Sequence, residues 1–230
     1  LFVFSIGNAG AQATSDSIVM NYLKEMGAPV TYNNEVKLLM TGHDKFVDLF
    51  ENIRHARHHI HLEYFNFRND SIANALFSLL AEKVKEGVKV RAMFDAFGNW
   101  SNNQPLKERH LKSIRAQGIE IVKFDPITFP WVNHAIHRDH RKIVVIDGKI
   151  GYTGGMNIAD YYINGLPKIG KWHDMHIHLE GDAVRYLQGI FLTMWNRETG
   201  QHVGGPAYFP DTPQLPDSIA EEIAIVDRTP

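Results

Sequence analysis

The stretch His140-Arg-Lys-Ile-Val-Val-Ile-Asp-Gly-Lys-Ile-Gly-Tyr-Thr153 decides the fold of this chain. Its apolar run to Ile146 predicts a buried strand. The pair Asp147-Gly148 supplies the positive φ angles that a type I′ turn requires. The stretch therefore predicts a β-hairpin whose first strand begins with charged residues.

A two-residue turn also predicts the register of the hairpin, because it pairs Ile146 directly with Lys149. Lys142 then stands opposite Thr153, and His140 stands opposite Gly155. Alternate residues of a strand point to the same face, so the side chains of His140 and Lys142 are expected on one side of the sheet. If the ladder continues, Asn157 joins them there.

These groups predict an anion site. An imidazole, an ammonium and a carboxamide would converge over bare glycine backbone, a combination that suits a tetrahedral phosphate. The predicted phosphate-binding residues are His140, Lys142, Gly154, Gly155 and Asn157.

The composition limits where an anion can bind. The 230 residues contain 24 Lys and Arg against 26 Asp and Glu, for a net charge of −2. The chain therefore has no global positive field for non-specific nucleic-acid binding, and no nucleic-acid partner is expected. With no cysteine, disulfides and thiolate metal sites are excluded.

Helical and strand-like patterns alternate along the chain, which is typical of an α/β sheet covered by helices. Apolar stripes predict helices within 46–53, 72–84, 106–116 and 182–197, and strands are expected at 36–40, 59–67, 88–97, 119–124 and 223–227. Residues 1–33 are expected to form an N-terminal segment and helix, 34–199 the main domain, and 200–230 a proline-rich linker followed by the start of a further half.

Two short segments have apolar character without the length of a membrane span. Residues 1–13 resemble either the end of a signal peptide or an ordinary apolar segment. In the loop before His140, Phe129 and Trp131 either contact lipid, as aromatic residues at a membrane interface do, or cap the core.

The spacing His140-x-Lys142, four residues, Asp147, six residues and then Gly154-Gly155-x-Asn157 resembles the HKD motif of the phospholipase D superfamily. Glycine stands at 155, where many members have serine. Further segments resemble the bacterial cardiolipin synthase branch, over residues of about 30 to 198; among them are Ala56 to Asp70, Asn157 to Asp160, and Trp172-His-Asp174. The resemblance implies the phospholipase D α/β/α sandwich with a mixed sheet.

The resemblance also implies a mechanism. His140 would attack phosphorus and form a phosphohistidine intermediate, with Lys142 and Asn157 binding the phosphate. Asp174 is the candidate acid for the Nδ1 atom of that histidine. Asp147 lies at the predicted turn, so a structural role is expected for it. No metal and no cofactor are implied.

Members of the superfamily use two HKD motifs, and this sequence contains one. The second is expected from a further half of the same polypeptide or from a homodimer. For the intact enzyme the resemblance implies phosphatidyl transfer between two phosphatidylglycerol molecules at a bacterial membrane. The alternatives are a homodimeric phosphodiesterase, phospholipase D or nuclease, and a non-catalytic half that only binds phospholipid.

Other polar residues have weaker interpretations. The histidines at 134, 137 and 140, or at 173, 176 and 178, could suggest a metal, but their spacing without paired acids is a weak ligand pattern. His59 and His61 are expected to be satisfied polar groups at the start of a strand. Glu63 and Asp95 could approach the cleft or form structural salt bridges.

Overall fold

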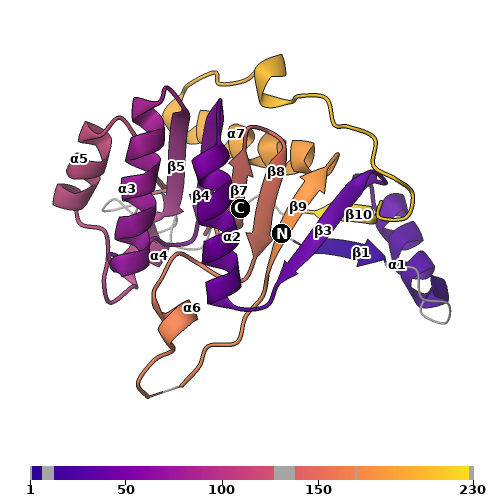
Figure 1. Cartoon of the computed structure of the whole chain (residues 1–230), viewed down its shortest axis with the longest axis horizontal. Coiled ribbons are helices and arrows are strands. Elements are labelled where there is room, and N and C mark those ends of the chain that lie inside the picture. Colours follow the sequence, from indigo (N-terminus) through magenta and orange to yellow (C-terminus); the bar gives the residue numbers. More distant parts are fainter. Residues whose placement is uncertain (1, 7–12, 127–137, 169, 228–230) are drawn as a thin grey trace.

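The computed structural model describes residues 2–6, 13–126, 138–168 and 170–227, and in it a mixed seven-stranded sheet forms the centre of the molecule (Figure 1). The strands lie in the order β3-β9-β8-β7-β4-β5-β6. Their bounds are β3 Asn34–Leu39, β4 His59–Tyr64, β5 Lys89–Asp95, β6 Glu120–Phe124, β7 Lys142–Ile146, β8 Ile150–Gly154 and β9 His176–Gly181. Strands β4, β5 and β6 run parallel, and the other neighbours are antiparallel.

Helices cover both faces of this sheet, which confirms the predicted α/β/α sandwich. Helices α2 (Gly42–His55), α3 (Ser71–Lys85) and α5 (Glu108–Ala116) pack on one face, and α7 (Val184–Thr199) packs on the other. Figure 1 shows α2 and α3 in front of the strands and α7 behind them. Because β4 and β7 lie between these layers, every residue of both strands is buried.

The predicted helices and strands are confirmed within a few residues at their ends. The N-caps explain two helix starts: the side chain of Thr41 accepts from Asp44 N at the start of α2, and that of Asp70 accepts from Ala73 N at the start of α3. The strand expected at 88–97 is shorter, since α4 (Ala96–Trp100) begins directly after β5 with Asp95 as its cap.

The hairpin itself is confirmed, but the predicted register is wrong by one residue. Asp147 and Gly148 have φ values of 54° and 67°, and Lys149 N donates to Ile146 O at 3.0 Å, as a tight turn requires. Ile146 nevertheless pairs with Ile150. Lys149 is therefore an extra exposed residue in the loop.

Burial of Tyr152 explains this register. Tyr152 pairs with Val144, faces α2, and its hydroxyl donates to Asp48 Oδ1 at 2.6 Å and accepts from Asn52 Nδ2 at 2.7 Å. A one-residue slip would turn this side chain to the opposite face. Continuing the observed ladder by one pair places Lys142 beside Gly154 instead of Thr153.

A second, three-stranded sheet joins segments from both ends of the sequence. Its order is β1 (Phe2–Ile6), β10 (Glu222–Val226) and β2 (Val30–Thr31), all antiparallel. Helix α1 (Ala13–Glu25) lies between β1 and β2 in the sequence. The buried side chains of Ile223 and Ile225 extend the hydrophobic core beneath α7.

Residues 201–221 connect α7 to β10 and are packed along the domain, over the end of the sheet that carries the Asp147-Gly148 turn (Figure 1). Arg185 donates to Phe209 O at 3.1 Å and to Pro210 O at 3.0 Å. The ring of Tyr208, at the end of the short 3₁₀ helix η2 (Pro206–Tyr208), stacks on His61 with centroids 5.5 Å apart. We call residues 201–221 the strap.

His59 and His61 lie beneath the strap as hydrogen-bonded core residues, as predicted. His59 Nε2 lies 2.8 Å from Gln188 Oε1, and Gln188 Nε2 lies 2.9 Å from His61 Nδ1. Burial lowers the pKa of His59 to about 4 and holds that of His61 well below its ordinary value. Both imidazoles are therefore neutral at physiological pH.

Candidate active site

The predicted site residues gather at one end of the central sheet, where β4, β5 and β8 finish and β7 and β9 begin. The loop after β4 contacts His140, Lys142 and Asn157. The Phe65 ring centroid lies 4.8 Å from that of His140 and 5.5 Å from Lys142 Nζ. Asn66 N donates to Asn157 Oδ1 at 3.4 Å.

Lys142 is a buried cation with one backbone contact. Its Nζ donates to His140 O at 2.6 Å, and its side chain is almost fully buried. Burial lowers the pKa of Lys142 to about 8, and the carboxylates of Asp139 and Asp174 oppose that shift. An anion bound here would restore the usual preference for the charged form.

His140 is more accessible than Lys142. Partial burial, followed by the nearby charge of Lys142, lowers the pKa of His140 below its ordinary value. The imidazole is therefore neutral near pH 7, the state in which a ring nitrogen can act as a nucleophile.

Gly154 and Gly155 lie at the same end of the sheet, where β8 ends, and Asp174 lies directly against Gly155. A Cβ atom at Gly155 would fall 2.0 Å from Asp174 Oδ1, and one at Gly154 would fall 2.7 Å from His176 Nδ1. At Gly154 the positive φ of 147° and the backbone of Met175 and His176 favour glycine, whereas at Gly155 a side chain would displace the carboxylate of Asp174. Serine, which many superfamily members have at the second position, would need Asp174 to move.

Asp174 is the residue that the resemblance assigned to Nδ1 of His140. Within residues 138–168 and 170–227, no hydrogen bond joins the two side chains, and Asp174 Oδ1 accepts instead from Met175 N at 2.8 Å. Its negative charge opposes the lowering of the pKa values of Lys45 and Lys142. A role for Asp174 toward Nδ1 of His140 stays a prediction.

Asp147 lies at the opposite end of β7 from His140. Its carboxylate accepts hydrogen bonds from the backbone N–H groups of Arg57, His58 and His59, at 2.8, 2.8 and 2.9 Å. These bonds fix the loop that leads into β4. Asp147 thus stabilises the fold and does not line the predicted phosphate site.

Two cationic or polar residues of the site were missed by sequence reasoning. Lys45 of α2 is fully buried, and its Nζ donates to Met156 O at 2.9 Å and to Asn157 O at 3.0 Å. His176 is also fully buried, and neither of its ring nitrogens is hydrogen bonded to any of the described residues. Burial holds the pKa values of both groups well below their ordinary values.

The segment after β8 is anchored to the start of α3 by a pair of carboxylates. Asp160 accepts from Ser71 N at 3.2 Å and from Ile72 N at 2.7 Å, and Asp160 N donates to Asp70 Oδ2 at 2.8 Å. With Lys45, these bonds hold Asn157 in place. The carboxamide Nδ2 lies 3.5 Å from the hydroxyl of Tyr162.

A buried charged cluster lies beneath the start of β7. Arg141 forms a bidentate pair with Asp227, at 2.7 and 2.8 Å, and lies 3.5 Å from Glu63 Oε1 and from Asp139 Oδ1. Burial, followed by the charge of Asp139, raises the pKa of Glu63 well above its ordinary value. Glu63 lies within this cluster beside Arg141, in line with the structural salt bridge that was one of its two sequence interpretations.

Asp95 also has a structural role at the edge of the site. Its Oδ1 accepts from Gly98 N at 2.8 Å and its Oδ2 from Asp139 N at 2.9 Å, while Arg138 NH1 lies 3.4 Å away. Asp95 thereby ties the end of β5 to the residues before His140.

The described residues show no group of three histidine or acidic side chains that could hold a metal ion. His178 is instead paired with Asp48 and Glu180 at 2.7 and 3.2 Å. Phe129 and Trp131, with His134 and His137, lie outside the described residues. In the part of the chain that the structure describes, no helix is long and apolar enough to cross a membrane.

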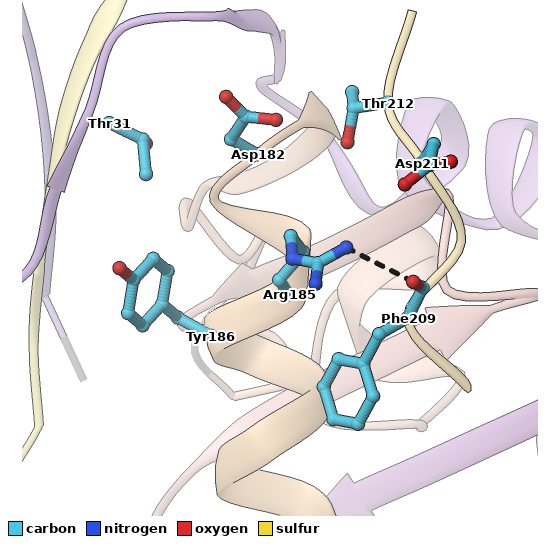
Figure 2. Close-up of a pocket in the computed structure, with 7 residues that line it drawn as sticks. All are labelled: Thr31, Asp182, Arg185, Tyr186, Phe209, Asp211 and Thr212. Carbon is cyan, nitrogen blue, oxygen red and sulfur yellow. Dashed lines mark hydrogen bonds between the residues drawn. The ribbon is translucent and has the colours of Figure 1, made fainter. Parts of the chain in front are cut away.

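A pocket of about 820 Å³ lies away from these residues, between β2, the start of α7 and the strap (Figure 2). Arg185 points across it to the backbone oxygen of Phe209. Its lining residues are Thr31, Asp182, Arg185, Tyr186, Phe209, Asp211 and Thr212. None of them belongs to the predicted site.

Solved structures place the fold in the phospholipase D class. The chain is similar to Nuc of Salmonella typhimurium, a phospholipase D family member, with a TM-score of 0.53 at 17% identity over 71% of this chain and 95% of that one. NucT of Helicobacter pylori gives a TM-score of 0.54 at 13% identity, covering 71% and 96%. These likenesses show the fold alone.

The family follows from closer relatives. The family described as cardiolipin synthase, PLD-like domain, matches residues 49–195. A cardiolipin synthase of Halalkalibacterium halodurans is 41% identical over 181 residues, covering 78% of this chain and 35% of that protein. One of Geobacillus sp. WCH70 is 40% identical over 189 residues, covering 82% and 36%.

The chain therefore belongs to the cardiolipin synthase branch of the phospholipase D superfamily, which confirms the resemblance seen in its HKD motif. It spans about a third of the length of the curated relatives that it matches.

Proposed function

We propose that this chain supplies one half of a phosphatidyltransferase active site that makes cardiolipin from two phosphatidylglycerol molecules. The supporting observation is that the accessible imidazole of His140 and the buried amine of Lys142 both lie beside the ring of Phe65, at the end of the sheet where Gly154 follows in the ladder beside Lys142. The relatives named cardiolipin synthase direct this phosphate chemistry toward phospholipid.

In the proposed reaction, a ring nitrogen of His140 attacks the phosphorus of the first phosphatidylglycerol. The bond from phosphorus to the glycerol headgroup breaks, and glycerol leaves with a proton from a general acid. A hydroxyl of the second phosphatidylglycerol then loses its proton and attacks the phosphohistidine. Cardiolipin forms, and His140 is released unchanged.

The chain's own residues stabilise charge on the phosphoryl oxygens. Lys142 provides a positive charge in a desolvated position, where an electrostatic interaction is strong. Asn157 provides an N–H donor. The general acid would be the histidine of a second HKD motif, from a further half of the polypeptide or from a second copy of the chain.

Conversion of phosphatidylglycerol vesicles tests the proposal, with the polypeptide that contains this chain as the enzyme. We expect cardiolipin and glycerol in equal amounts, an acid-labile and base-stable phosphate on His140, and no effect of chelator. His140→Ala should reduce the rate at least about a thousandfold, in line with the loss of a nucleophile. The matched control is His43→Ala, an exposed histidine on α2.

Two outcomes would contradict this function. One is cardiolipin formation that survives His140→Ala. The other is cleavage of DNA or of simple phosphodiesters with no transfer to phosphatidylglycerol.

A further inference from the structure

One segment beside the site is exposed, apolar and basic at the same time. Between Asn157 and Asp174 the chain leaves the sheet, forms α6 (Tyr161–Asn164), and returns through a tight hairpin in which Leu166 and Gly170 exchange backbone hydrogen bonds at 2.9 and 2.8 Å. Figure 1 shows this excursion projecting beyond the end of the sheet. We call residues 161–168 and 170–173 the rim hairpin.

The charge of the rim hairpin has one sign. Lys168 and Lys171 are exposed, and residues 161–173 contain no Asp or Glu. The acids that flank this segment are occupied: Asp160 caps α3, and Asp174 lies against Gly155. A chain with net charge −2 thus presents a local positive charge beside its phosphate site.

Exposed apolar side chains accompany these lysines. Ile163 is 42% exposed, Trp172 37% and Met175 51%. Strands β3 and β9 pair up to Leu39 and His176, so one further step places Met40, which is 58% exposed, beside Met175. Trp at an interface and Lys among phosphates are the residues that anchor proteins to a membrane surface.

The base of the rim hairpin connects this surface to the site. The ring of Trp172 lies 5.1 Å from that of Tyr161 and 6.1 Å from that of Tyr162, and the hydroxyl of Tyr162 lies 3.5 Å from Asn157 Nδ2. The aromatic packing that supports Trp172 therefore also supports Asn157, a proposed phosphate-binding residue.

We propose that the rim hairpin docks on an anionic phospholipid bilayer, with Trp172 and Ile163 in the interface and Lys168 and Lys171 among the lipid phosphates. This inference rests on the proposed function, because it names the surface from which the lipid substrate enters. Docking there brings the lipid headgroups to the end of the sheet where His140 lies.

Vesicle sedimentation tests the docking without any turnover. The His140→Ala chain is mixed with vesicles of phosphatidylglycerol and phosphatidylcholine in equal parts, or of phosphatidylcholine alone. We expect binding to the anionic vesicles that weakens with salt. Lys168→Glu with Lys171→Glu should lower the partition coefficient about thirtyfold or more, since each lysine near an anionic surface contributes about a factor of five.

The matched control is Lys85→Glu with Lys89→Glu. It makes the same charge change with two exposed lysines at the other end of the sheet. We expect no more than about a twofold effect there, because these residues lie beyond the reach of a docked surface.

A fluorescence measurement tests the insertion of Trp172. Lipids with a quenching group in the upper acyl chain should quench the parent chain more than Trp172→Phe, a change that keeps an aromatic ring against Tyr161. Equal quenching would overturn the docking geometry, as would hairpin charge variants that bind like the parent, or absence of binding to anionic vesicles. Hairpin-dependent binding without cardiolipin formation would refute the proposed function alone.

Discussion

The HKD motif has a charged residue at each end of β7, and the two differ in how many hydrogen bonds they form within the protein. At the turn end, Asp147 accepts three backbone hydrogen bonds. At the site end, Lys142 is buried, and within the described residues its Nζ donates one hydrogen bond, to a backbone oxygen. A charged group whose hydrogen bonds are all made within the protein stabilises the fold. A buried charged group with few such bonds can still bind a ligand of opposite charge. The comparison teaches that one short motif can divide its residues between stability and chemistry.

The largest effect is expected when the site end loses its cation. Lys142→Met should lower the rate of cardiolipin formation about 100- to 1000-fold, the usual cost of losing a group that stabilises transition-state charge. Stability should stay unchanged or rise by up to about 1 kcal/mol, since a buried charge without a carboxylate partner is replaced by an apolar chain. Urea unfolding of the same samples checks this, and a large loss of stability would contradict the comparison.

The converse change is Asp147→Ala at the turn end. Loss of three charge-assisted hydrogen bonds and alanine at a φ of 54° should lower the free energy of unfolding by about 3 kcal/mol. The folded protein should keep its activity within about twofold. Asp147→Asn, which retains one acceptor oxygen and tolerates the positive φ, should lose about half as much. A strong loss of activity in folded Asp147→Asn would place this carboxylate in the chemistry.

The pH dependence separates the same two properties. The proposed reaction requires neutral His140 and charged Lys142, so kcat/KM should form a bell that rises below pH 6.5 and falls near pH 8. The folded pKa of Lys142 lies below its unfolded value, so the unfolded chain binds more protons between about pH 8 and 10.4, and stability should rise over that range by about 3 kcal/mol. Lys142→Arg should move the alkaline limb of the kcat/KM profile to higher pH. It should also remove the contribution of Lys142 to the rise in stability. If the alkaline limb stays at the same pH in Lys142→Arg, it reflects the titration of another group.

The smallest effect is expected at Glu63, beneath the site end. Because burial raises the pKa of Glu63, the neutral form is favoured in the fold, and Glu63→Gln should change stability by less than about 1 kcal/mol. A raised folded pKa contributes stability that is present below about pH 4.5 and lost as pH rises through the folded value. The variant should flatten that loss in unfolding curves recorded from pH 4 to 8. If Glu63→Gln lost several kcal/mol of stability at pH 5, the native protein would contain the charged form of Glu63.

Much of this architecture could be predicted from sequence because it depends on local rules. Apolar periodicity located the helices and strands, and Asp147-Gly148 located the hairpin. The register could not be predicted in the same way, because it depends on Tyr152 reaching Asp48 and Asn52 of α2. That contact joins residues about a hundred positions apart.

Two site residues were missed for a similar reason. Lys45 stands one turn before Leu49, on the buried side of α2, and a lysine at such a position is a usable signal. His176 gave no signal that separates it from His178, which is paired with two acids. The role of Asp174 was taken from the family motif, and only the structure shows its proximity to Gly155.

The second sheet has a consequence for the order of folding. Strands β1 and β10 bring Phe2 beside Val226, so this pairing closes a loop of nearly the whole chain. Such non-local contacts carry the full entropic cost of closure before they return any stability. We expect the three-stranded sheet to be the last element to form during refolding, and its amide hydrogens to exchange before those of β4 and β7.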